Sequence, residues 1–143
     1  MSIETGTGQD TLERHKQLIY DMWRDVTAQD LDAVRTYYHA DAVYHAGSGD
    51  LTGREAIMSY YQGYYAGFPD FKGEVSMIVA EGDLVAHMAK VSGTNSGDFL
   101  GIPATGKFVS SSGMLMTRMR DGKIIEEWEC FDYSDVMRQL GLA

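Results

Sequence analysis

A chain of 143 residues has the size of one domain, and its 44% hydrophobic content is enough to fill a core. The 21 acidic and 12 basic residues give a formal net charge of −9, which argues against nucleic acid or an anionic membrane surface as a partner. The single cysteine, Cys130, excludes an internal disulfide framework and a cysteine-based zinc site, and it fits a reducing compartment such as the cytoplasm.

The N-terminal part of the chain predicts a long helix over about residues 10 to 27. Asp10 and Glu13 have the spacing of a capping box, and apolar side chains then recur at helical intervals. The preceding residues are polar and acidic and do not resemble a signal peptide, and no later run is long and apolar enough to span a membrane. We therefore expect a cytoplasmic protein with one domain, 1–143, in which residues 1–9 are a flexible N-terminus.

Two further helices and a strand are predicted before the middle of the chain. "QDLDAVRTYYH" has acidic residues at a helix start, and "ADAVYHAG" has the pattern of a short strand. In "LTGREAIMSYYQGYYAGF", Thr52 and Glu55 have capping-box spacing and are followed by apolar and aromatic residues at helical intervals. Pro69 ends this helix.

The second half of the chain has the pattern of strands. Two β-rich runs flank Gly82-Asp83 and two more flank Asp121-Gly122, which predicts two long hairpins. Between them, "SGDFLGIPATG" predicts a loop over a pocket mouth, and the final "SDVMRQLGLA" is either a short helix or a tail. This order predicts an α+β domain with helices on one side of a curved, mainly antiparallel sheet, around an apolar hollow suited to a small molecule.

The second hairpin determines where Asp132 points. If Asp121-Gly122 forms a two-residue turn, Ser111 pairs with Asp132, and the sheet face that holds Asp132 also holds Trp128 and mainly apolar side chains. A carboxylate there would be partly desolvated and suited to proton transfer. One bulge would exchange the two faces, and Asp132 could equally be the N-cap of a final helix, so both interpretations stay open.

Three segments carry a resemblance to a known family: "FPDF" at 68–71, "GDFLGIPATGK" at 97–107 and "DGKIIEEWECFDYSDVMRQLGL" at 121–142. Together they are similar to the SnoaL-like polyketide cyclases, within the nuclear transport factor 2-like superfamily. The resemblance covers about residues 10 to 142 and implies a cone-shaped α+β barrel. It also implies an enzyme, of lyase or isomerase type, that closes a ring in an aromatic polyketide by intramolecular aldol condensation without a cofactor. Asp132 would be its general acid/base.

Five side chains are candidates for contact with a small hydrophobic or aromatic substrate: His45, Trp128, His87, Tyr20 and Tyr61. Either histidine could instead be a satisfied structural residue, and Tyr61 belongs to a tyrosine stripe that is more typical of core or dimer contacts. Tyr44 or Tyr20 could be the oxyanion donor of an isomerase. Glu127 and Glu129 alternate out of phase with Asp132 and are expected on a solvated or interface face.

The predicted function is a cofactor-independent polyketide cyclase-like enzyme that forms a homodimer or homotetramer. The scattered histidines and carboxylates show no metal-ligand spacing, and no glycine loop for phosphate is present, so neither a metal nor a cofactor is expected. Nucleic acid and membrane are not expected as partners. The alternatives are a noncatalytic module that binds a small hydrophobic ligand or dimerises, and an isomerase or epoxide hydrolase on the same fold.

Overall fold

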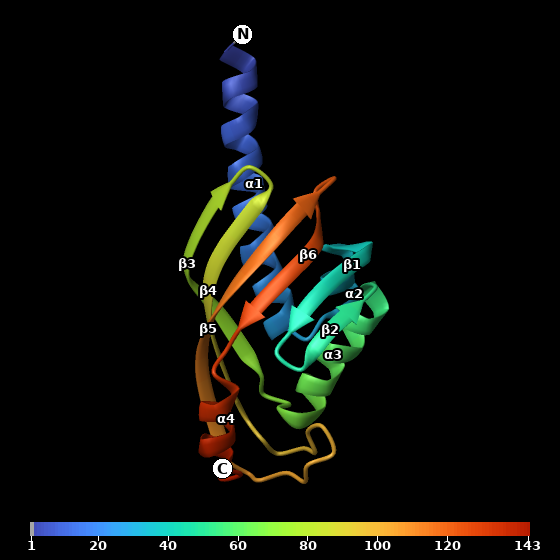
Figure 1. The fold of residues 1–143 in the computed structure, drawn as a ribbon, viewed down its shortest axis with the longest axis vertical. Helices are drawn as coiled ribbons and strands as arrows, with labels where there is room; N and C mark the ends of the chain where they lie inside the picture. Colours follow the sequence, from blue (N-terminus) through green and yellow to red (C-terminus); the bar gives the residue numbers. More distant parts are fainter. Residues whose placement is uncertain (1) are drawn as a thin grey trace.

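The structure, a computed structural model, describes the backbone of residues 2–143 and the side chains of residues 8–143. Its helices and strands follow in the order α1 (Ser2–Thr27), α2 (Leu31–Thr36), β1 (Tyr38–Ala46), β2 (Gly49–Thr52), α3 (Arg54–Gly67), β3 (Lys72–Glu81), β4 (Leu84–Thr94), β5 (Phe108–Arg120), β6 (Lys123–Cys130) and α4 (Tyr133–Leu140) (Figure 1). Within the described residues, no helix is both long and apolar enough to cross a lipid bilayer. Most helices precede most strands, as the sequence predicts.

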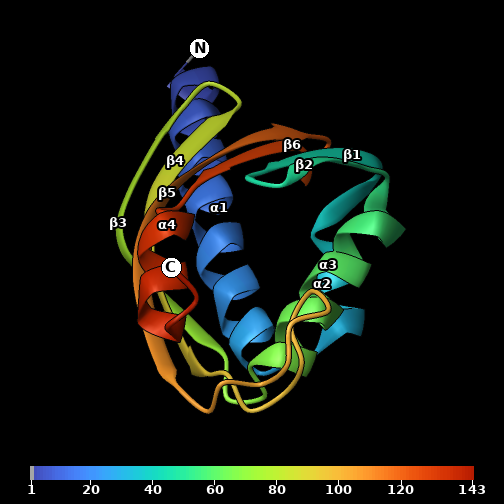
Figure 2. The same ribbon diagram turned by 60° about the horizontal axis from the view of Figure 1, so that its bottom comes forward.

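The strands form one mixed sheet in the order β2-β1-β6-β5-β4-β3. β1 and β6 run parallel, and the other neighbouring strands pair antiparallel. The sheet curves around α1 and α3, which lie on its concave side, and it stays open between its edge strands (Figures 1 and 2). The predicted α+β fold, with N-terminal helices packed on a curved, mainly antiparallel sheet, is confirmed, although the sheet does not close into a full barrel.

The helix α1 packs on the sheet through an apolar stripe. Four side chains of this stripe recur at the spacing of one helix face and are buried: Ile19, Met22, Trp23 and Val26. The helix begins at Ser2 and passes through Asp10, so the predicted start near residue 10, with its capping box, is wrong. The predicted flexible segment includes Met1, which lies outside the described residues.

The start of α3 also differs from its predicted capping box at Thr52. Gly53 is the N-cap residue, with a φ of 91° that glycine adopts without strain, and no side chain in the described part of the chain caps this helix. Glu55 instead pairs with Arg35 of α2, whose Nε lies 3.1 Å from Glu55 Oε2. The helix ends before Pro69, as predicted.

The hairpin of β5 and β6 contains a register shift that decides which side chains face the core. Arg120 pairs with Lys123 as predicted, but the register slips by one residue at Arg118, which pairs with Glu126. Leu115 therefore pairs with Glu129, and Thr117 with Glu127, on the buried side. From Glu126 to the end of β6, the side chains therefore point to the sheet face opposite to the predicted one. The slip turns Glu127 and Glu129 inward and Trp128 outward.

The loop between the two hairpins is held by one buried amide. Asn95 Nδ2 donates to the Gly67 carbonyl at 3.2 Å and the Gly97 carbonyl at 2.9 Å, and Asn95 Oδ1 accepts from the backbone N and Oγ1 of Thr105. Phe99 of this loop joins a small core cluster with Phe68, Val109 and Leu140. The predicted loop therefore has a defined conformation that ties the end of α3 to β5 and α4.

Candidate functional site

The strand β6 places two carboxylates on the concave side of the sheet, and the first, Glu127, is fully buried with 0% exposure. Its Oε1 accepts a hydrogen bond of 2.6 Å from the Tyr38 hydroxyl, which lies 2.9 Å from the Tyr61 hydroxyl. Glu127 Oε2 is buried and has no hydrogen-bond partner among the described residues. Burial raises the pKa of Glu127 to about 8, repulsion by Glu129 adds to this rise, and the bond from Tyr38 opposes it.

The second carboxylate, Glu129, is held by tyrosines from three different elements. Tyr44 of β1 donates to Oε2 at 2.6 Å, and Tyr60 of α3 donates to Oε1 at 2.8 Å. Tyr133, the first residue of α4, donates to the same Oε1. Hydrogen bonds to a charged acceptor are stronger than those between neutral groups, so this arrangement fixes Glu129 between the sheet and two helices.

These side chains form one connected group, called here the tyrosine–glutamate cluster: Tyr38, Tyr44, Tyr60, Tyr61, Tyr133, Glu127 and Glu129. Burial is the first cause that raises the pKa of every tyrosine in the cluster above its usual value. The phenols therefore stay neutral and keep their protons across the physiological pH range. The cluster combines neutral phenols, whose O–H groups donate within the cluster, with a carboxyl group whose pKa is raised to about 8. A carboxyl group with a pKa near neutrality is suited to act as a general acid or base.

An aromatic wall continues from the cluster toward the loop that carries Phe99. The ring of Tyr60 lies 5.0 Å from that of Tyr64, whose ring in turn lies 4.9 Å from that of Phe99. Tyr60 and Tyr64 are only partly buried. This wall therefore packs the partly buried rings of Tyr60 and Tyr64 against the buried ring of Phe99, and it joins α3 to the loop.

Asp132 lies at the surface and caps α4. Its Oδ1 accepts a hydrogen bond of 3.0 Å from the Asp135 backbone N–H, and its side chain is exposed. The predicted inward placement of Asp132 beside Trp128 is wrong, because Asp132 follows the end of β6 and the register shift turns Trp128 outward. The helix-cap interpretation is confirmed, and the final stretch is a helix. A catalytic role for Asp132 stays a prediction.

His45 and Trp128 lie together, away from the cluster. Their rings stack with centroids 5.3 Å apart on the side of the sheet opposite to Glu127. His45 Nε2 lies 2.7 Å from Glu126 Oε2, and its Nδ1 lies 2.8 Å from Asp50 Oδ1. These bonds, that to Glu126 first, raise the pKa of His45. The predicted position of His45 and Trp128 on the concave pocket wall is therefore wrong. The register slip turns Trp128 outward, and on β1 the buried Tyr44 takes the inner face, so its neighbour His45 points outward.

The other three predicted contact residues lie in different environments. Tyr61 is buried within the cluster, and its hydroxyl contacts that of Tyr38. Tyr20 is 45% exposed on α1, so its predicted place in the pocket is wrong. His87 is buried on the concave face of β4 and accepts a hydrogen bond from Trp23. Whether Tyr61 and His87 contact a substrate stays a prediction.

Pattern analysis missed the two glutamates and part of the tyrosine set. Glu127 and Glu129 alternate with Glu126 and Trp128, so either face of β6 could be the inner one. Tyr44 was a candidate oxyanion donor, and in the structure it donates to Glu129. Among the described residues, no three His, Cys, Asp or Glu side chains are grouped as a metal site.

The model of the family described as SnoaL-like polyketide cyclase matches residues 17–140. No curated protein matches this chain in sequence.

Solved structures share the whole fold. IdmH of Streptomyces antibioticus, provisionally assigned as a polyketide cyclase, is 32% identical, with a TM-score of 0.76 over 88% of this chain and 97% of IdmH. AclR of Streptomyces galilaeus, provisionally assigned as a hydroxylase, is 29% identical, with a TM-score of 0.81 over 92% of this chain and 97% of AclR. TsrD of Streptomyces laurentii has a TM-score of 0.83 over 92% of this chain and 97% of TsrD; at 22% identity that likeness concerns the fold alone.

Proposed function

Because the chain belongs to the SnoaL-like polyketide cyclase family, we propose that it is a cofactor-independent enzyme that closes a ring in a small hydrophobic or aromatic carbonyl compound by an intramolecular aldol reaction. The observation that carries this proposal is the buried Glu127 carboxyl group. One of its oxygens is held by Tyr38, and the other has no partner among the described residues and could exchange a proton with a substrate that reaches it. Function does not follow from the fold alone, so the proposal rests on this group.

The reaction would proceed by two proton transfers at Glu127. The ionised carboxylate takes a proton from the carbon beside a carbonyl, and a phenol of the cluster stabilises the enolate oxygen after its O–H turns from its present acceptor toward the substrate. The enolate carbon then attacks a second carbonyl of the same molecule, which forms the carbon–carbon bond and leaves an alkoxide. The alkoxide takes the proton back from Glu127, so atoms and charge balance without an added reagent.

This proposal gives Glu127 the role that the family resemblance assigns to Asp132. Proton transfer needs a group in contact with substrate in a water-poor site, and Glu127 is buried among donors whereas Asp132 is exposed. Both assignments predict the same reaction and differ in the residue that carries the proton. Separate variants of the two residues therefore distinguish them.

The test is deuterium uptake by ketones in D₂O, at the carbon next to the carbonyl, with 1-tetralone and 2-acetyl-1-tetralone as probes. Wild-type protein should accelerate uptake above the buffer rate. Glu127→Gln should lower the protein-dependent rate by about 100-fold or more, because an amide cannot accept the proton. Glu74→Gln, an exposed carboxylate on β3, is the matched control. If Glu127→Gln keeps deuterium uptake and Asp132→Asn loses it, Asp132 and not Glu127 is the general acid/base.

A noncatalytic ligand-binding module is the second candidate, and the complete burial of Glu127 favours it. A substrate can reach this carboxyl group only if neighbouring aromatic side chains move. If the protein retains 1-tetralone in equilibrium dialysis and leaves its deuterium uptake at the buffer rate, the binding module is the better description.

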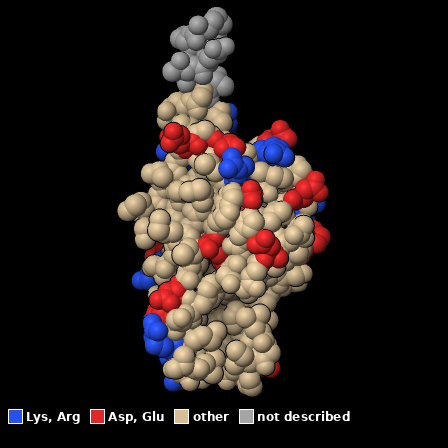
Figure 3. Space-filling view, viewed as in Figure 1, with Lys and Arg blue, Asp and Glu red and all other residues tan. Residues whose placement is uncertain are grey.

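We also propose that two copies of the chain associate through the outer face of the sheet. Figure 3 views this face, where uncharged surface covers much of β3, β4 and β5 and many charged side chains gather at the end near the start of α1. The large exposed apolar side chains of this face include Met77, Val79, Met114 and Met116. Exposed apolar surface of this kind marks interaction sites, and methionine packs adaptably.

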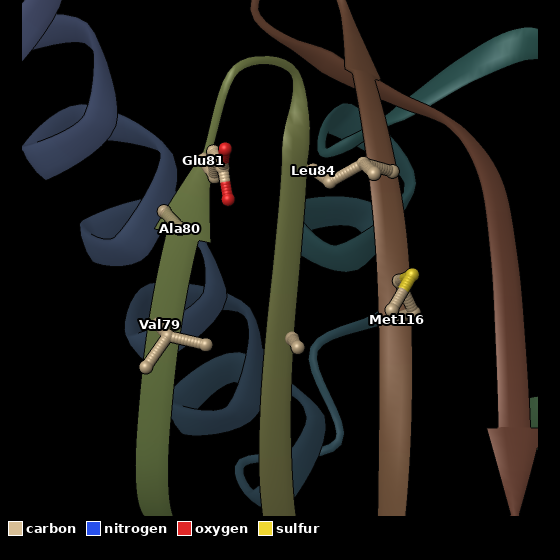
Figure 4. A pocket seen from close by; sticks show the side chains of 6 residues that line it. Val79, Ala80, Glu81, Leu84 and Met116 are labelled. Atoms are coloured by element: carbon tan, nitrogen blue, oxygen red, sulfur yellow. The ribbon is translucent and has the colours of Figure 1, made fainter.

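A hollow on this face suits a second copy of the chain. It has a volume of about 220 Å³ and is lined by Val79, Ala80, Glu81, Leu84, Ala86 and Met116 of three neighbouring strands (Figure 4). Only one of these lining residues, Glu81, is charged. Two chains that each carry a net charge of −9 repel least where their facing surfaces hold few acids, and a two-fold axis would bring the same apolar side chains together.

A further inference from the structure

His87 is a buried polar group that the proposed reaction does not use. It lies on β4 between Val85 and Ala89, which face the core, and it is 3% exposed. Its neighbours across the sheet are Ile78 on β3 and Leu115 on β5. A histidine in such apolar surroundings is uncommon, so its hydrogen bonds indicate what it does.

The contact with Trp23 determines which nitrogen of His87 carries the proton. Trp23 Nε1 lies 3.0 Å from His87 Nε2, and an indole N–H can only donate. His87 Nε2 is therefore the acceptor, and the proton of the neutral ring lies on Nδ1. Burial lowers the pKa of His87 to about 4, so the ring is neutral at pH 7.

Trp23 itself is held in place by its neighbours. Its hydrogen bond to Nε2 therefore fixes the direction in which the Nδ1–H of His87 points. A Cβ atom at Gly73 of β3 would lie 2.5 Å from Trp23 Cζ3, so the indole ring fills the space that any larger residue at this position would need. The two rings meet edge to face, with centroids 6.2 Å apart. The sheet and α1 together therefore hold the imidazole in one orientation and one tautomer.

His87 Nδ1 is buried and has no hydrogen-bond partner within the part of the chain that the structure describes. Buried N–H groups almost always have an acceptor, which is a protein group, an ordered water or a ligand. We propose that the Nδ1–H of His87 is a neutral hydrogen-bond donor for a carbonyl oxygen of the bound substrate. This inference rests on the proposed function, because it adds a second contact to the same substrate.

The register relates this donor to the tyrosine–glutamate cluster. Leu115 of β5 pairs with His87 on one side and with Glu129 on the other. Glu127, which removes the proton, lies two residues before Glu129 on β6 and pairs with Thr117. Since neighbouring strands lie about 4.8 Å apart and two residues of a strand span about 6.7 Å, His87 and Glu127 are separated by about 12 Å. The substrate class is therefore a flat polycyclic compound with carbonyl groups at both ends, one that accepts from His87 and one beside the carbon that loses its proton at Glu127. The smaller 1-tetralone has one carbonyl group and tests either contact singly.

The first test measures the tautomer of His87 by ¹⁵N NMR of the imidazole nitrogens. Nδ1 should be protonated and Nε2 unprotonated at pH 7, and addition of 1-tetralone should shift the Nδ1–H signal. Trp23→Phe should release the constraint and produce a mixture of tautomers. A proton on Nε2 in the wild-type protein, or an Nδ1–H signal that 1-tetralone leaves unchanged, would overturn the inference.

The second test compares binding of 1-tetralone with binding of tetralin, which has the same ring shape and no oxygen. Wild-type protein should prefer the ketone, and His87→Phe should reduce that preference by about 2- to 10-fold, the worth of one hydrogen bond. His87→Gln should restore it, because its amide can accept from Trp23 and still donate. Equal binding of both compounds by the wild type, or an unchanged preference in His87→Phe, would refute the donor role.

This binding ratio is independent of deuterium uptake. Loss of the ketone preference in His87→Phe supports the donor whether or not Glu127→Gln loses activity. If Glu127 fails its own test while the His87 ratio behaves as expected, the proposed reaction is wrong and the binding contact stands. A folding defect would weaken binding of ketone and hydrocarbon together and leave their ratio unchanged, so it is distinguishable from loss of the donor.

Discussion

Tyr38 at the start of β1 donates its hydroxyl proton to Glu127 of β6 at 2.6 Å, and both side chains are completely buried. The bond joins parallel strands that are 89 residues apart at this point. It leaves the second carboxyl oxygen, Oε2, without a partner among the described residues. A buried carboxyl group in this state favours its protonated form, which links the chemistry of the site to the stability of the fold.

We expect the stability of the protein to fall as the pH rises from about 4.5 to about 8. The folded pKa of Glu127 is raised to about 8 from an ordinary value of 4.5, so the folded state holds a proton that the unfolded chain releases. The contribution is fully present below the unfolded pKa and is lost as pH rises through the folded pKa. Glu127→Gln mimics the protonated form and should flatten this dependence on pH. At pH 9 its free energy of unfolding should exceed that of the wild type by a few kcal/mol. Urea unfolding at several pH values measures it.

The matched control for this prediction is Glu74→Gln, which removes an exposed carboxylate and should keep the wild-type pH dependence. A Glu127→Gln protein whose unfolding free energy follows the wild-type pH profile would show that Glu127 is ionised in the folded state at neutral pH.

Removal of a phenol donor from Glu129 should destabilise the protein. Tyr44→Phe and Tyr60→Phe each delete one hydrogen bond to the partly buried carboxylate of Glu129, and each should cost about 1.5–3 kcal/mol in urea unfolding at pH 7. Tyr20→Phe, at an exposed position on α1, should change the free energy of unfolding by less than about 0.5 kcal/mol. Equal effects at all three positions would mean that the bonds to Glu129 contribute nothing measurable.

Two substitutions at Asp132 separate its capping role from catalysis. Asp132→Ala should lower the free energy of unfolding by about 1 kcal/mol, because it removes the acceptor for the Asp135 backbone N–H. Asp132→Asn should keep the stability, since asparagine is an equally good N-cap. If Glu127 transfers the proton, Asp132→Asn also keeps deuterium uptake by the ketone probes. Loss of uptake in this stable variant would contradict that expectation directly.

His45 should titrate above its ordinary pKa of 6.5 because of two carboxylates. Glu126 is the larger cause and Asp50 the second, so Glu126→Gln should lower the pKa of His45 more than Asp50→Asn does. A raised folded pKa stabilises the protein below the unfolded pKa, and this contribution is lost as pH rises through the folded value. NMR titration of the His45 ring measures both shifts. An unchanged titration in Glu126→Gln would contradict the hydrogen bond between them.

A charge on the outer sheet face should prevent association of two copies. Met116→Lys places a cation beside the hollow that Val79 and Leu84 also line, where burial in an interface would desolvate it. Sedimentation velocity should show dimers for wild type and monomers for Met116→Lys. Leu142→Lys, at an exposed apolar position near the C-terminus, should leave the association unchanged. A monomeric wild-type protein would rule out this interface.

Much of the fold could be predicted from local pattern. The turns at Gly82 and Asp121, the end of α3 before Pro69 and the buried stripe around Trp23 all depend on residues close together in the chain. The resemblance to the SnoaL-like family rested on such segments too, and the family model confirms it over residues 17–140. The helix starts were predicted less well, because capping-box spacing also occurs inside a continuous helix, as at Asp10.

The sequence by itself determined the α+β class, the order of the elements and the family, because hydrophobic period and turn chemistry are local properties. Only the tertiary structure decided which carboxylates face the interior. Glu126, Glu127, Trp128 and Glu129 alternate with little difference in polarity between the two faces, and a one-residue register slip at Arg118 reverses them all. That slip is a property of the pairing between two strands, which the local pattern of either strand does not specify, and it puts Glu127 rather than Asp132 among the buried tyrosines.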